Sequence, residues 1–198
     1  MNQNNTQSSG YLQLKQGAYL IRLKLIKWEV TMAQDAKQYI AEALLQLMEK
    51  KDLKEIHIKD LVAKAGVSRM SYYRYFSSKE EILQYYMKYI LERYMNTVEQ
   101  NNANSFHSYE HILQSLLFFQ QYKHFALCLH KAGMDSLLLD ALNDYIRKQP
   151  AFDEHKCIRS YPFYFYAGAL YNIFMQWILH DTVDSAEDLA QIIGRLRL

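Results

Sequence analysis

The sequence predicts an all-α protein. Proline occurs twice and glycine six times in 198 residues, so few positions interrupt a helix. Apolar residues recur at three- and four-residue spacing from Gln34 onward, the period of a helix that buries one face. Half of the residues are apolar, enough for one domain, or for a small domain that shares a long helix with a larger one.

Residues 1–31 are interpreted as a disordered or non-functional extension. Residues 1–10 are polar and lack an apolar period. The stretch that follows is apolar but carries cations that argue against an export signal, namely Lys15, Arg22, Lys24 and Lys27. It could also form a basic amphipathic segment that lies on a membrane surface or docks on the protein.

Three short helices are expected next, in a domain at 32–78. The first covers about 34–49, where apolar residues form one face and lysines follow at the end. The second contains apolar residues at helical spacing and ends at Gly66, because glycine readily takes the positive φ of a helix C-terminus. Ser68 then caps a third helix that runs to about Phe76.

A long fourth helix is expected to lead into a larger helical domain at 79–198. Ser77 and Ser78 precede Glu80 and Glu81, so either serine begins a capping box. The polar patch at 100–105 predicts a loop. Further helices are expected near 108–121, 123–131, 135–148, 160–180 and 185–197.

The second and third helices form a helix-turn-helix, which presents its second helix to the DNA major groove. The net charge of +2 is small, but positions 57–79 hold one acid, Asp60, against five cations. These are Lys59, Lys64, Arg69, Arg74 and Lys79. On the third helix, Tyr72 and Phe76 should face inward with Val67, because they lie four residues apart.

The outward side chains of the third helix suit base recognition; they are Arg69, Met70, Ser71, Tyr73 and Arg74. Arginine can bind guanine through two hydrogen bonds, serine can contact base edges, and methionine or tyrosine can press on a thymine methyl. Lys79 lies in the first turn of the next helix, where ammonium and free amides could face one phosphate. The alternative is an ordinary amphipathic helix with solvated arginines.

The segment KDLVAKAGVSRMSYYRYFSSKEEIL resembles the DNA-binding signature of the TetR/AcrR regulator family, strongly over 34–95. The resemblance implies a three-helix DNA-binding domain, a larger helical domain with an effector pocket, and a dimer built on the last two long helices. It also implies that Arg69, Met70, Ser71 and Arg74 face bases, with Lys59 near the DNA. Tyr73, Tyr75 and Lys79 would hold phosphates.

The chain departs from the family pattern at two positions. His57 stands near the start of the second helix, where family members usually have Ser or Thr, which puts the capping of that helix in question. Met70 stands where a small residue is common, so it could change the bases that are accepted.

The larger domain is rich in aromatic residues, which predicts an apolar pocket with a few polar tips. The effector candidates are Phe118, Tyr122, Phe125, Tyr164 and Tyr171, although an aromatic stripe can equally be core. His124 and His130 lie six apart, unlike paired metal ligands on one helical face. Neither a metal nor a cofactor is expected.

A homodimer is expected through the last two long helices. Gly168 is a small residue that permits close approach of a partner helix, and Ile173 and Trp177 extend the same face. Ile192 belongs to the final helix, which would supply the second pair of helices in a four-helix interface.

The expected function is a sequence-specific DNA-binding transcription regulator: a repressor that a small molecule releases from its operator. The alternative is an effector-independent regulator, or an activator that works through a protein partner. An enzyme is not expected, because nucleophile-elbow, phosphate-loop and zinc-protease motifs are missing. Two cysteines without a paired motif and no long uncharged apolar run favour the cytoplasm.

Overall fold

The computed structural model describes residues 33–100, 108–148, 152 and 157–196. Every regular element in these ranges is a helix, which confirms the all-α prediction. The extension at 1–31 and nearly all of the loop expected at 100–105 lie outside the described residues.

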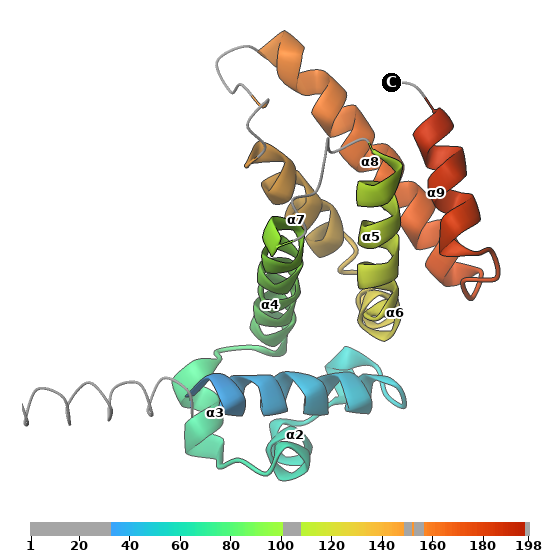
Figure 1. Ribbon diagram of the computed structural model, residues 1–198. Coiled ribbons are helices and arrows are strands. Elements are labelled where there is room, and N and C mark those ends of the chain that lie inside the picture. Colours follow the sequence, from blue (N-terminus) through green and yellow to red (C-terminus); the bar gives the residue numbers. More distant parts are fainter. Residues whose placement is uncertain (1–32, 101–107, 149–151, 153–156, 197–198) are drawn as a thin grey trace, which may run out of the picture.

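The helical segments of the N-terminal unit lie below the rest of the molecule (Figure 1). A helix at 33–48 crosses this unit. It is followed by the 3₁₀ helix η1 (Leu53–Glu55), α2 (Ile58–Ala65) and α3 (Arg69–Tyr75). The three α-helices match the predicted ranges to about one residue, whereas η1 was not predicted.

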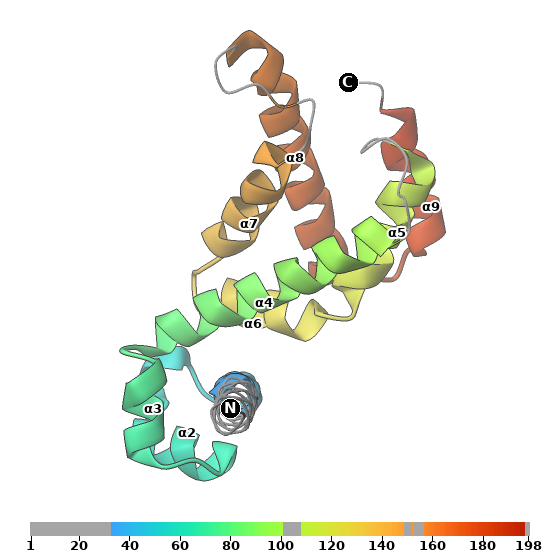
Figure 2. The same ribbon diagram turned by 60° about the vertical axis from the view of Figure 1, so that its left-hand side comes forward.

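Helix α4 (Lys79–Gln100) rises from the N-terminal unit into the upper part of the molecule. There it meets α5 (Tyr109–Gln120), α6 (Lys123–Lys131) and α7 (Ser136–Arg147). The chain ends with α8 (Cys157–Leu179) and α9 (Ala186–Arg195). Figure 2 shows α7 packed beside α8 above α4, and α5 packed beside α9 at the right.

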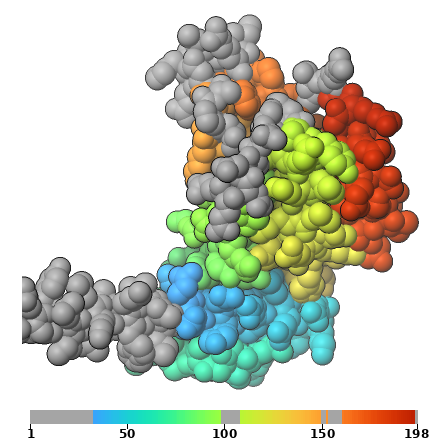
Figure 3. Space-filling model, in the orientation of Figure 1, coloured from blue at the N-terminus to red at the C-terminus, as the bar shows by residue number. Residues whose placement is uncertain are grey.

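Two apolar cores hold these helices together. The first is continuous from the N-terminal unit through α4 to α5, α6 and α7, and it includes Leu44, Phe76, Ile90 and Leu129. It therefore crosses the domain boundary expected between 78 and 79. The second joins α5 and α6 to α8 and α9, and the space-filling view shows α9 on the outer face (Figure 3).

Helix α6 connects the upper helices to the N-terminal unit by polar contacts as well. Lys131 Nζ lies 3.0 Å from a carboxylate oxygen of Asp52, and His124 Nε2 lies 3.4 Å from Glu49. Burial raises the pKa of the Cys128 thiol to about 11, with a further contribution from the Glu49 charge. Cys128 therefore behaves as an inert core residue at neutral pH.

Within the described ranges, no helix combines the length and hydrophobicity needed to cross a bilayer. The same residues contain no group of three His, Cys, Asp or Glu side chains placed to hold a metal ion.

Candidate DNA interface and ligand cavity

The turn between α2 and α3 depends on a glycine. Gly66 has φ +68° and ψ +27°, a left-handed conformation that costs glycine little. The amide of Val67 donates to Val62 O at 3.1 Å, and the amide of Gly66 donates to Ala63 O at 3.4 Å. This pair of hydrogen bonds is a Schellman motif. It ends α2 and sets the direction in which α3 leaves the turn.

Ser68 begins α3 as predicted. Its hydroxyl accepts a hydrogen bond from the amide of Ser71 at 3.0 Å, which satisfies a free amide of the first turn. The hydroxyls of Ser68 and Ser71 are also 3.0 Å apart. Ser71 is thus half-buried and paired with the cap.

The two faces of α3 differ sharply in exposure. Tyr72 and Phe76 are 1% and 3% exposed and belong to the first core, so the inward face is confirmed. Met70 and Tyr73 are 74% and 65% exposed. Since Arg69 and Arg74 are exposed too, α3 presents cations, a thioether and a phenol on one surface.

A shallow hollow lies beside this surface, between the start of α2 and α3. It is lined by His57, Ile58, Lys59, Arg69 and Tyr73. Lys59 is exposed there, so two cations and an imidazole meet at one edge of the helix-turn-helix. The hydroxyl of Tyr73 and these groups can all act toward phosphate oxygens.

Tyr75 and Lys79, the other two residues expected to bind phosphates, make contacts within the protein. Tyr75 is half-buried, with the ammonium of Lys37 5.7 Å from its ring centre. Lys79 Nζ donates to the carbonyls of Leu53 and of Ile56, the latter at 3.0 Å. The side chain of Lys79 therefore joins the start of α4 to both ends of η1.

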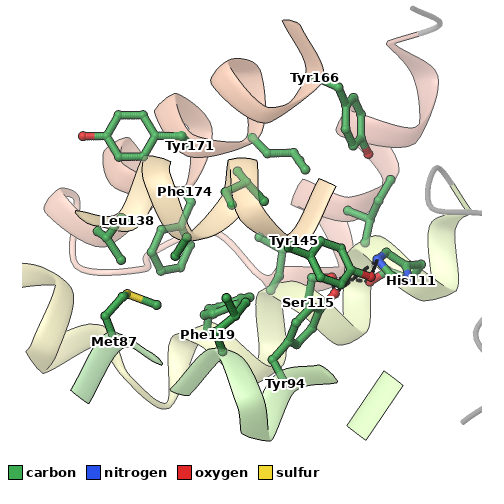
Figure 4. A pocket seen from close by; sticks show the side chains of 16 residues that line it. Met87, Tyr94, His111, Ser115, Phe119, Leu138, Tyr145, Tyr166, Tyr171 and Phe174 are labelled. Atoms are coloured by element: carbon green, nitrogen blue, oxygen red, sulfur yellow. Dashed lines mark hydrogen bonds between the residues drawn. The ribbon is translucent and has the colours of Figure 1, made fainter. Parts of the chain in front are cut away.

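A cavity of about 100 Å³ lies between α4, α5, α7 and α8. Its sixteen lining residues are mostly apolar (Figure 4). They are Met87, Leu91, Tyr94, His111, Ile112, Ser115, Leu116, Phe119, Leu138, Ala141, Leu142, Tyr145, Tyr166, Leu170, Tyr171 and Phe174.

Only one of the five effector candidates named from the sequence, Tyr171, is among these lining residues. Phe118 and Phe125 are 9% and 2% exposed in the first core. Tyr122 is half-buried, and its ring centre is 5.3 Å from that of Phe118. Tyr164 is exposed and accepts a hydrogen bond from Arg147 Nε at 3.4 Å.

Sequence reasoning missed a polar cluster at one side of the cavity. Tyr94 Oη lies 2.6 Å from Ser115 Oγ and 3.1 Å from His111 Nε2, and Tyr145 Oη lies 3.4 Å from the same imidazole nitrogen. His111 and Ser115 are four apart on a helix and flank the buried Ile112. Two polar residues at this spacing on an apolar helix face could have indicated the polar cluster from the sequence.

Three of the tyrosines that line the cavity stay protonated at neutral pH. Burial raises the pKa of Tyr94 well above its usual range, and it raises the pKa of Tyr166 to about 12. Burial also raises the pKa of Tyr171. Their hydroxyls are therefore neutral groups that can donate and accept hydrogen bonds.

The four residues expected at a dimer interface are spread over two environments. Trp177 is 4% exposed in the second core, and its indole N–H donates to Asp184 O at 2.9 Å. Ile173 is half-buried against the same core. Ile192 is 56% exposed, and a Cβ built on Gly168 would meet no atom within 4 Å.

Comparisons with known proteins agree with this arrangement. Residues 40–86 match the family model described as bacterial regulatory proteins, tetR family. This match covers α2, α3 and their turn. No curated protein sequence matches the chain.

Solved structures share the fold over most of this chain. The dihydroxyacetone kinase operon activator DhaS is 18% identical, with a TM-score of 0.58 over 81% of this chain and 93% of its own. A TetR transcriptional regulator from Streptococcus agalactiae 2603V is 18% identical, with a TM-score of 0.52 over 85% and 97%. A putative TetR-family regulator from Syntrophomonas wolfei is 16% identical, with a TM-score of 0.57 over 81% and 92%. The helix-turn-helix segment thus matches the tetR-family model over residues 40–86, and the chain is similar in fold to these regulators.

Proposed function

We propose that this regulator represses transcription as a homodimer that binds operator DNA through α2 and α3, and that a small molecule in the cavity releases it. The observation that carries the DNA proposal is the two-faced α3. Buried Tyr72 and Phe76 fix its inner face, while Arg69 and Arg74 project outward. A rigid helix with two outward arginines is what bidentate recognition of guanine requires.

The proposed roles follow from exposure. Arg69, Met70 and Arg74 read base edges, and Ser71 contributes from the first turn beside its cap, Ser68. Lys59, Tyr73 and Tyr75 contact phosphates at the rim of the same surface. The proposed DNA-binding domain is 32–78, and 79–198 holds the ligand and the second subunit.

A second copy of the chain is the proposed partner of α8 and α9. Several large apolar side chains on these helices are exposed in the single chain: Tyr161, Phe165, Leu179, Ile192 and Leu196. Gly168 lies on α8 with open space above it, which permits close helix approach. A two-fold axis between the α8–α9 pairs would place two α3 helices for successive major grooves, about 34–36 Å apart.

Repression requires no contact beyond these, because a dimer seated on an operator that overlaps a promoter blocks the polymerase. The position of the cavity supports the proposal of ligand-dependent release. Its wall includes Met87, Leu91 and Tyr94 of α4, the helix whose first turn adjoins the DNA-binding domain. The proposed location is the cytoplasm, where the DNA and metabolites are.

The decisive experiment is genome-wide mapping of bound DNA, followed by fluorescence anisotropy on the recovered site. The wild type should bind this site far more tightly than a shuffled duplex, and Arg69→Ala/Arg74→Ala should lose that preference. Wild-type binding that does not depend on sequence would contradict the proposal. A promoter reporter then separates repression from activation through a protein partner, since only an activator raises the signal when the regulator is expressed.

A further inference from the structure

The cavity is uncharged as well as apolar. None of its sixteen described lining residues is Lys, Arg, Asp or Glu. A carboxylate or ammonium group buried without a partner costs several kcal/mol or more. The lining therefore disfavours charged ligands as a class, including organic acids, amines and phosphate esters.

The polar groups of the lining gather mainly on one side. Tyr94, His111, Ser115 and Tyr145 meet there, whereas Met87, Leu138 and Phe174 form an apolar wall opposite (Figure 4). A ligand can satisfy this arrangement with one polar group at one end. The rest of its surface must be apolar to match the opposite wall.

Donor and acceptor roles within the cluster follow from its distances. Ser115 Oγ donates its only hydrogen to His111 O at 2.7 Å, so in the 2.6 Å contact with Ser115 it is Tyr94 that donates. The oxygen of Tyr94 then accepts from His111 Nε2 at 3.1 Å. In this arrangement the imidazole carries a proton on Nε2.

The dimensions and the aromatic walls restrict the ligand further. An apolar cavity of roughly 150 Å³ holds benzene, so a cavity of about 100 Å³ limits the ligand to at most one small ring. Phe119, Phe174 and Tyr145 supply ring faces and edges around this space, which pack favourably on another ring.

We infer that the effector is a small, uncharged, ring-sized molecule that places one hydroxyl or carbonyl group on the Tyr94–His111–Ser115–Tyr145 cluster. This inference rests on the proposed role of the cavity as the ligand site. It assigns the chemical class of the ligand and the side of the cavity that recognises its polar group.

The test uses four probes that share one ring: benzyl alcohol, toluene, benzoate and benzylammonium. Each is titrated at pH 7 into the full chain carrying ¹³C-methyl methionine, and the Met87 methyl signal, identified with Met87→Leu, reports occupancy. Benzyl alcohol should bind at least tenfold more tightly than either charged probe, and at least threefold more tightly than toluene.

Two tyrosine variants locate the polar contact. Tyr145→Phe should reduce the affinity for benzyl alcohol to that for toluene and leave toluene binding unchanged. The matched control is Tyr85→Phe, because Tyr85 lies outside the lining and packs on Phe76 near the start of α4. It should change neither affinity. Cooperative thermal unfolding confirms that each variant is folded.

Several results would overturn the inference: tightest binding of benzoate or benzylammonium, equal binding of toluene and benzyl alcohol, or no response of Met87 to any probe. Operator binding is measured separately by anisotropy without a probe. If operator binding persists while the probes fail, the ligand class is wrong and the regulator role stands. If the operator is not recognised but benzyl alcohol binds selectively, the regulator role fails and the cavity chemistry stands.

Discussion

Replacing Lys79 by methionine tests whether its ammonium stabilises the N-terminal unit. Methionine keeps most of the apolar stem and removes the hydrogen bonds to the Leu53 and Ile56 carbonyls. A hydrogen bond to a charged group contributes about 1.5–3 kcal/mol. The Lys79 side chain is only half-buried, which weakens its two hydrogen bonds. We therefore expect Lys79→Met to lower the free energy of unfolding by about 2 kcal/mol.

Urea unfolding and calorimetry measure this loss. For a protein of this length, about 2 kcal/mol corresponds to a Tm lower by about 4–8 °C. Lys88→Met is the matched control, because Lys88 is an exposed lysine on the same helix, and it should leave Tm within about 1 °C.

The salt dependence of operator binding separates this role from a phosphate contact. Loss of one phosphate contact reduces the slope of log K against log salt by about 0.9. We expect that reduction for Lys59→Met, and an unchanged slope for Lys79→Met. A Lys79→Met protein as stable as the wild type, with a slope reduced by about 0.9, would refute the reasoning and return Lys79 to the phosphate contacts.

Three further predictions concern other parts of the molecule. Arg69→Ala and Arg74→Ala should each cost about 1–3 kcal/mol in discrimination at one base pair, measured with single-substitution operators; equal losses on all sequences would assign both to the backbone. In a Cys157→Ser variant, Cys128 should react with iodoacetamide at pH 8 about 200-fold more slowly than free cysteine does. The reason is that a pKa of about 11 leaves a much smaller fraction of the thiol as thiolate. Rapid labelling would contradict the burial of Cys128. Gly168→Trp should give a folded monomer by light scattering, since a Cβ at this position meets open space in the single chain whereas an indole ring would hold a closely packed partner helix away. A persistent dimer would move the interface elsewhere.

Local chemistry allowed most helix boundaries to be predicted. Gly66 and Ser68 act through hydrogen bonds to residues within five positions, so their roles can be recognised in a short segment. The 3₁₀ helix η1 was missed because three residues carry too little periodicity. The contacts of Lys79 were missed because they reach back 26 and 23 residues.

The cavity could be predicted as a type of site but not residue by residue. Phe118 and Phe119 are adjacent and chemically identical, yet Phe118 is buried in the core while Phe119 lines the cavity. Which one faces the cavity depends on how α5 is rotated against α4 and α7, and no local pattern contains that angle. The position of Trp177 could not be predicted for the same reason, because its burial depends on packing against α5 and α9.

The length of α4 has a mechanical consequence. Its 22 residues span about 33 Å at 1.5 Å per residue, and the core that runs along it prevents the N-terminal unit from moving as a loose body. A rotation of about 5° at one end of such a rod displaces the other end by about 3 Å, close to the 3.4 Å rise of one base pair. If the two displacements add in a dimer, the spacing of the α3 helices changes by about 6 Å, which is more than one base-pair step.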